Sequence, residues 1–100
     1  MKAWIFAAAA LCLTSCSSKP SEAEARQALA DLMAQSASAP VITIEGFTLT
    51  GCKKADDTDG HRCDTRGTVV LDMAGNRVPL PVGKNLRYAK VDGTWRAYAQ

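Results

Sequence analysis

The sequence predicts an α+β fold in which one N-terminal helix packs on a curved antiparallel sheet of four to five strands. Apolar residues recur at helical spacing between residues 21 and 40. From Val41 onward, segments rich in β-branched and aromatic residues alternate with turn signals. One helix followed by a run of strands is typical of a helix that covers one face of an antiparallel sheet.

A capping box marks the expected start of the helix. Ser21 is followed three residues later by Glu24, and the two can satisfy each other's first-turn amides. The small and polar residues 36–40, with Pro40 last, predict the end of the helix. The apolar stripe is narrow and rich in alanine, so we expect close packing on the sheet. Its members are Ala25, Ala28, Leu29, Leu32 and Met33.

The strands are expected from β-rich segments bounded by turns. Gly46 and Gly51 interrupt the first segment and predict bulges. Pro79 and Pro81 cannot donate ladder hydrogen bonds, so their segment is expected at an edge or as irregular structure. Asp92-Gly93 is a two-residue turn signal. The expected strands are Val41–Thr50, Thr65–Met73, Arg77–Val82, Leu86–Val91 and Thr94–Tyr98.

The N-terminal residues resemble the signal and lipobox of bacterial lipoproteins. Lys2 precedes the uncharged run Ala3–Leu13, which is shorter than the roughly 20 residues of a membrane-spanning helix. Leu13-Thr14-Ser15-Cys16 then follows. The resemblance implies export, cleavage before Cys16 and a thioether-linked lipid on its sulfur. The alternative is an ordinary cleaved signal followed by an incidental cysteine.

The resemblance also implies the domain organisation and the location. Residues 1–15 form the signal peptide, residues 16–20 a lipidated tether and residues 21–100 a single α+β domain. An aspartate after the lipidated cysteine generally retains such proteins in the inner membrane, and Ser17 stands there instead. We therefore expect the periplasmic face of the outer membrane, reached through the lipid on Cys16.

Cysteine usage predicts a structural disulfide. Of the four cysteines, Cys12 lies in the signal and Cys16 takes the lipid, which leaves Cys52 and Cys63. An exported compartment is oxidising and favours their pairing. Redox pairs usually have about two residues between their cysteines, and a metal pair would need further soft ligands. The predicted disulfide closes a short loop and is worth about 3 kcal/mol.

The polar loop Lys53–Arg62 contains no complete catalytic or metal-binding motif. Aligning Asp57 and Asp59 with a calcium-binding loop puts Ala55 at its first ligand position and Arg66 at its last. We therefore interpret the acidic residues as a solvated hairpin tip. No metal or cofactor is expected.

His61, the only histidine, is expected to be an exposed loop residue. Cysteine–histidine catalysis would require a free thiolate, and Cys63 should be oxidised. We therefore predict that the protein is not an enzyme. A formal net charge of +2 provides no strongly basic surface, so no nucleic-acid partner is expected.

The order of the elements and the closing hairpin Lys90–Trp95 resemble small exported domains of the cystatin-like or nuclear-transport-factor-2-like type. The resemblance implies a helix packed into the concave face of a curved sheet. Such folds host enzymes, ligand binders and scaffolds alike, so the fold alone assigns no function. The expected core side of the hairpin comprises Leu86, Tyr88, Trp95, Ala97 and Ala99.

The outer face of the closing hairpin is the expected partner surface. It carries Arg87, Arg96 and Tyr98, residue types that are enriched at interaction hot spots. We expect a non-catalytic binding or envelope-assembly module with a protein partner in the envelope. The alternative is an inhibitor or immunity protein against a cell-wall hydrolase or toxin, with Lys53–Arg62 as its protruding loop. A small-molecule carrier would require a cavity between helix and sheet.

Overall fold

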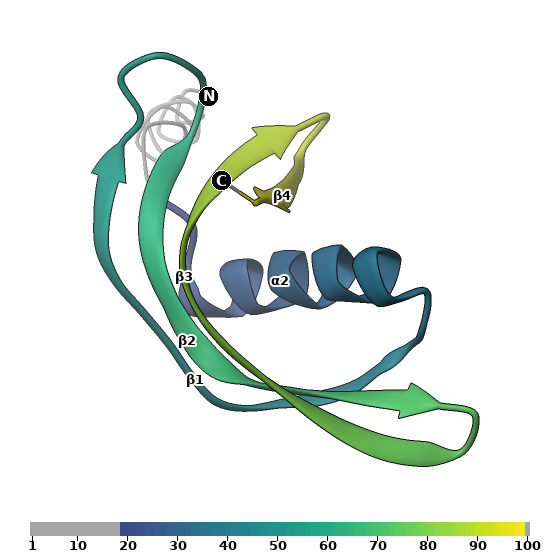
Figure 1. Cartoon of the computed structure of the whole chain (residues 1–100). Coiled ribbons are helices and arrows are strands. Elements are labelled where there is room, and N and C mark those ends of the chain that lie inside the picture. Colours follow the sequence, from purple (N-terminus) through teal and green to yellow (C-terminus); the bar gives the residue numbers. More distant parts are fainter. Residues whose placement is uncertain (1–18, 100) are drawn as a thin grey trace, which may run out of the picture.

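The computed structural model describes residues 19–99, so the lipobox and Cys16 lie outside the described residues. Four strands form one antiparallel sheet in the order β1-β2-β3-β4, and α2 lies across its concave face (Figure 1). This arrangement confirms the predicted α+β class. The elements are α2 (Glu22–Ala37), β1 (Val41–Lys54), β2 (His61–Met73), β3 (Asn76–Val91) and β4 (Thr94–Tyr98).

Helix α2 begins and ends where the sequence predicts. The Glu24 amide donates to Ser21 Oγ at 3.1 Å, and the Ser21 amide donates to Glu24 Oε1 at 2.9 Å, which completes the capping box. At the other end Ser38 adopts a left-handed conformation, and the Ala39 amide donates to the Ala34 carbonyl. The helix thus ends a few residues before β1 begins.

The strands are longer than the sequence predicted. β1 continues past Thr50 to Lys54, and β2 begins at His61 rather than Thr65. The expected strands Arg77–Val82 and Leu86–Val91 are one continuous strand, β3. Continuous register with β2, from Asn76 opposite Met73 to Tyr88 opposite His61, explains the continuity. The sheet therefore has four strands, within the predicted four to five.

Two glycines bend β1 as expected. Gly46 and Gly51 have φ values of +63° and +61°, where side-chain-bearing residues are rare. The register with β2 shifts between Glu45 and Thr48 and again between Thr50 and Lys53. These bulges curve the sheet around α2.

The β2–β3 hairpin projects beyond the rest of the sheet (Figure 1). The first residue of β1, Val41, pairs with Leu71, and the Asp72 amide donates to the Pro40 carbonyl just before β1 at 2.9 Å; beyond Asp72, the hairpin tip has no β1 partner. Its turn residues Ala74 and Gly75 have positive φ values, which suit a tight hairpin turn. We call residues 72–77 the hairpin arm.

The core lies between α2 and the concave face of the sheet, with contributions from all four strands. Tyr88 is its largest fully buried side chain, and Leu29 and Val69 are also buried. The Cys52–Cys63 disulfide, confirmed here, joins β1 to β2 beside this core. On the closing hairpin, Leu86, Tyr88 and Ala97 are buried as predicted, whereas Trp95 is half-buried and Ala99 is exposed.

Candidate functional site

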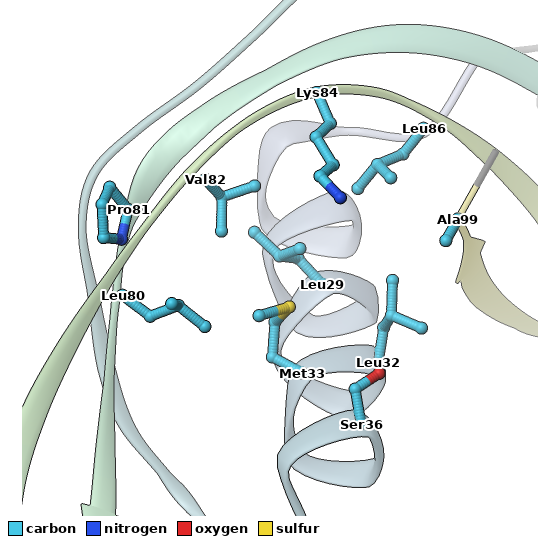
Figure 2. A pocket seen from close by; sticks show the side chains of 10 residues that line it. All are labelled: Leu29, Leu32, Met33, Ser36, Leu80, Pro81, Val82, Lys84, Leu86 and Ala99. Atoms are coloured by element: carbon cyan, nitrogen blue, oxygen red, sulfur yellow. The ribbon is translucent and has the colours of Figure 1, made fainter.

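An apolar groove lies between α2 and β3, with a volume of about 270 Å³. Ligand sites commonly measure about 300–1,000 Å³, so this groove suits a few apolar side chains better than a large ligand. Figure 2 shows the side chains of the two elements facing one another across it. Leu29, Leu32 and Met33 come from α2, and Leu80, Val82 and Leu86 come from β3.

The side chains of β3 alternate between the two faces of the sheet, and those on the concave face form one wall of the groove. Successive side chains of a strand point to opposite faces, so the even-numbered residues share one face. Leu86 and Tyr88 are buried on the concave face, and Leu80 and Val82 continue the same series toward the hairpin arm. Because α2 lies nearer to β1 and β4, these two side chains are only partly covered. Leu80 is 38% exposed.

One cation borders the groove. Lys84 belongs to the even-numbered series and lies opposite Thr65 in the sheet. Figure 2 shows its side chain reaching from β3 toward the helix. An apolar groove with a single positive charge at its rim favours a partner that presents apolar groups and one carboxylate.

The sequence-predicted partner surface lies on the opposite, convex face. Arg87 is directly opposite Tyr98 in the β3–β4 ladder, and its guanidinium carbon lies 4.3 Å from the centre of the Tyr98 ring. Arg87 Nη1 also donates to the Asp59 carbonyl at 2.8 Å. Arg96 is exposed on the same face. Arg87 thus packs against Tyr98, both side chains are half-buried, and Arg96 is the exposed member of the three.

The polar loop is hydrogen-bonded to β3 through Asp59, and its residues 56–59 are exposed. The Ala55 amide donates to the Gly60 carbonyl at 2.9 Å, and Ala55 is buried. Arg62 and Asp57 form an ion pair at 3.0 Å, which lowers the pKa of the Asp57 carboxyl. The loop proper covers only residues 55–60, because Lys53, Lys54, His61 and Arg62 belong to strands. The loop is therefore shorter than the predicted Lys53–Arg62, and its residues 56–59 are exposed, as expected for a solvated hairpin tip.

His61 is not the exposed loop residue that the sequence predicted. It is the first residue of β2, pairs with Tyr88 in the ladder and is half-buried. Its Nδ1 atom is buried without a hydrogen-bond partner in the described part of the chain. The expectation failed because β2 extends farther than the β-propensity of residues 61–64 indicates.

A buried pair of hydroxyls ties the core to the disulfide. Thr65 Oγ1 and Tyr88 Oη lie 2.7 Å apart, and the Thr65 hydroxyl also donates to the Cys63 carbonyl at 3.3 Å. Burial raises the pKa of the Tyr88 phenol, and the hydrogen bond to Thr65 partly opposes that shift. This pair positions Tyr88 beside the groove residue Leu86.

Among residues 19–99, no group of three or more His, Cys, Asp or Glu side chains could hold a metal ion. No helix in the same range is long and apolar enough to cross a membrane. The two thiols of this range are joined to each other. Besides the groove, the described surface carries other hollows, one of which lies between α2 and β4 and is bordered by Arg96 and Tyr98.

Sequence reasoning missed the groove residues Leu80, Val82 and Lys84. The signal that could have found them is the two-residue period that runs from Leu80 to Tyr88. Pro79 and Pro81 obscured this period, because prolines in a segment argue against a regular strand.

The fold and this groove define a small α+β domain in which one helix covers part of a four-strand antiparallel sheet. Comparisons of the chain with protein-family models, with curated proteins and with solved structures give no match.

Proposed function

We propose that the protein is a membrane-anchored periplasmic lipoprotein that acts as a non-catalytic binding or envelope-assembly module. The observation that carries the binding role is the open apolar groove between α2 and β3. Contiguous apolar surface that a small domain leaves accessible marks an interaction site. The anchor and the outer-membrane location rest on the lipobox resemblance of residues 13–16 and on Ser17.

The frame around the groove supports this role. The capping box, the disulfide and the buried Thr65–Tyr88 pair fix the helix and the sheet on either side. A groove that exists before its partner arrives avoids the entropic cost of ordering it on binding. The cystatin-like or nuclear-transport-factor-2-like resemblance is consistent with this helix-in-sheet architecture.

The inhibitor or immunity role remains the alternative proposal. Its loop comprises residues 55–60, of which residues 56–59 are exposed. The Ala55 amide closes the loop by donating to the Gly60 carbonyl, and Arg87 of β3 donates to the Asp59 carbonyl. The apolar groove favours the binding module over this alternative.

Capture of the lipidated protein from membranes tests the function. Leu80→Ser should reduce recovery of the partner because it removes an apolar side chain from the groove rim. Val91→Ser is the matched control, because Val91 is as exposed as Leu80, at 38%, and lies outside the groove. Equal recovery with both variants and with the wild-type protein would contradict a binding role for the groove.

The anchor is tested separately. Cys16→Ala should abolish lipid labelling and leave unprocessed or soluble protein. Intact mass spectrometry of the wild-type protein should find the mature N-terminus at Cys16 with the mass of its lipid. An unmodified N-terminus at another residue would contradict the lipoprotein proposal.

A further inference from the structure

The outer edge of β3 has no strand partner over much of its length. β3 comprises 16 residues, but β4 pairs only with Arg87–Val91. On its other side, β3 pairs with β2 from Asn76 to Tyr88. Among residues 19–99, no strand therefore pairs with the outer edge from residue 77 to residue 85.

The two flanking turns determine which backbone groups point outward. Both are two-residue hairpin turns, so Met73–Asn76 and Val91–Thr94 are hydrogen-bonded pairs. Even-numbered residues of β3 therefore bond to β2, and odd-numbered residues bond to β4 or face the open edge. Arg77, Gly83 and Asn85 thus present both an N–H and a C=O group to the edge.

Two prolines limit that edge. Pro79 and Pro81 occupy odd-numbered positions, so they cost no hydrogen bond to β2 but remove two outward donors. Proline on an exposed edge is a common protection against unspecific pairing. Unlike residues 79 and 81, Gly83 and Asn85 retain donors, and they lie beside the groove residues Val82 and Lys84.

The open edge of β3 and the groove are adjacent. One partner could therefore provide backbone groups for the edge and side chains for the groove. A strand added to the edge would place alternate side chains on the concave face, as β4 does with Trp95 and Ala97. Those side chains would lie opposite Leu80, Val82 and Lys84. The backbone of the added strand would form hydrogen bonds with the N–H and C=O groups of Gly83 and with the carbonyl groups of Pro79 and Pro81.

We propose that an extended segment of a partner protein adds to the outer edge of β3 as a fifth strand. Its alternate apolar side chains fill the groove, and a carboxylate pairs with Lys84. This inference rests on the proposed function, because it names the site and the partner class of the same binding module. Strand addition of this kind combines main-chain hydrogen bonds with side-chain pockets.

The open backbone groups distinguish this occupant from two others. An acyl chain would fill the groove but would leave the backbone donors and acceptors of the edge unpaired. A second copy paired about Gly83 would place the two Lys84 side chains at a diagonal position, where like charges repel. A partner segment with an acidic residue satisfies both the backbone and the charge.

A labelled peptide on the lipidated full-length protein in detergent tests the proposal. The peptide Glu-Thr-Val-Thr-Val, blocked at both ends and paired antiparallel, places Glu opposite Lys84 and its valines opposite Val82 and Leu80. We expect saturable binding by fluorescence anisotropy. A control peptide methylated on both threonine amides should bind about tenfold or more weakly, because it cannot donate to β3.

Gly83→Pro is the decisive variant, with Gly83→Ala as its matched control. Proline removes the outward donor without affecting the ladder to β2, whereas alanine keeps the donor. A Cβ at Gly83 would lie 3.6 Å from Arg66 Nη1, an ordinary contact. We expect about tenfold or more loss of peptide affinity for Gly83→Pro. Gly83→Ala should retain affinity, and both variants should keep the wild-type melting temperature.

Other outcomes would contradict strand addition without contradicting the proposed binding function, which is tested separately. If Gly83→Pro bound the peptide as the wild type does, or if the wild type bound no peptide, strand addition would be wrong. Leu80→Ser would still test the binding module by membrane capture. If the wild type dimerised and Gly83→Pro did not, the edge would belong to a second copy. If a fatty acid displaced the peptide and bound both variants equally, the groove would belong to an acyl chain.

Discussion

The two ends of the curved sheet differ in how much holds them in place. At one end β4, the Cys52–Cys63 disulfide and the loop residues 55–60 surround β2 and β3. At the other end the hairpin arm has neither a β1 partner nor β4 beside it.

This difference separates stability from binding along a single strand. The C-terminal part of β3 contributes Tyr88 and Ala89 to buried positions, whereas its middle contributes Leu80 and Val82 to an open groove. A small domain has few apolar residues, so leaving some uncovered lowers its stability. The crosslinked end offsets that cost. Variants at different places in the fold can therefore test whether stability and binding depend on different parts of β3.

The largest expected effect is loss of the disulfide. Reduction should lower the free energy of unfolding by up to about 3 kcal/mol, since the crosslink closes a short loop. Amide hydrogen exchange should accelerate in residues 61–65 and remain unchanged in the hairpin arm. The double variant Cys52→Ala/Cys63→Ala, which should not respond to reductant, is the control. Free Cys52 and Cys63 thiols in the native protein would contradict the pairing.

The buried Tyr88–Thr65 pair should contribute less. Tyr88→Phe leaves the Thr65 hydroxyl with only its bond to the Cys63 carbonyl, so we expect a loss of about 1 kcal/mol at neutral pH. Burial raises the pKa of the Tyr88 phenol, so the unfolded chain ionises first as the pH rises. The wild type should therefore lose stability above about pH 10.

Tyr88→Phe tests whether Tyr88 causes the loss of stability at alkaline pH. Urea unfolding at several pH values should show a weaker fall in stability for Tyr88→Phe than for the wild type. Tyr98→Phe is the matched control at an accessible position. Parallel curves for all three proteins would show that Tyr88 does not cause the alkaline loss.

A similar but separate contribution comes from the helix cap. Ser21→Ala should cost about 1 kcal/mol. The Ser21 amide, with smaller contributions from Lys90 and Trp95, lowers the pKa of Glu24. The stabilisation that depends on the Glu24 charge is therefore present above the ordinary carboxyl pKa and is lost as the pH falls through the lowered value.

Glu24→Gln separates the charge from the hydrogen bond. Glutamine keeps an acceptor for the Ser21 amide, so this variant should retain most of the stability and lose part of the acid dependence. Thermal unfolding between pH 3 and 7 measures both quantities. Acid curves that coincide for Glu24→Gln and the wild type would contradict the charge contribution.

The helix, its cap and the disulfide could be predicted because each depends on residues near in sequence or on counting. Predicting the capping box requires only Ser21 and Glu24. Predicting the disulfide requires only that two cysteines, Cys52 and Cys63, are left after the others are assigned. The groove could not be predicted in the same way. It arises because α2 lies across β1 and β4 and leaves Leu80 and Val82 partly uncovered, a fact of tertiary packing. The strand around Pro79 and Pro81 was underestimated because their outward position depends on the register with β2.

The smallest expected effect on stability belongs to the convex face. Arg96 is exposed, so Arg96→Ala should change the free energy of unfolding by about 0.5 kcal/mol or less. Tyr98→Ala should cost up to about 1 kcal/mol, because the half-buried ring also loses its contact with Arg87. A strand added to β3 would continue the line of β4, which brings its outward side chains closest to Tyr98. Arg96→Ala and Tyr98→Ala should therefore weaken partner recovery more than His61→Ala or Asp57→Ala, and less than Gly83→Pro. Arg87→Ala is unsuitable here, because it also releases the Asp59 carbonyl. Recovery that depends on Asp57 and His61 but not on Arg96 and Tyr98 would place the partner on the polar loop instead.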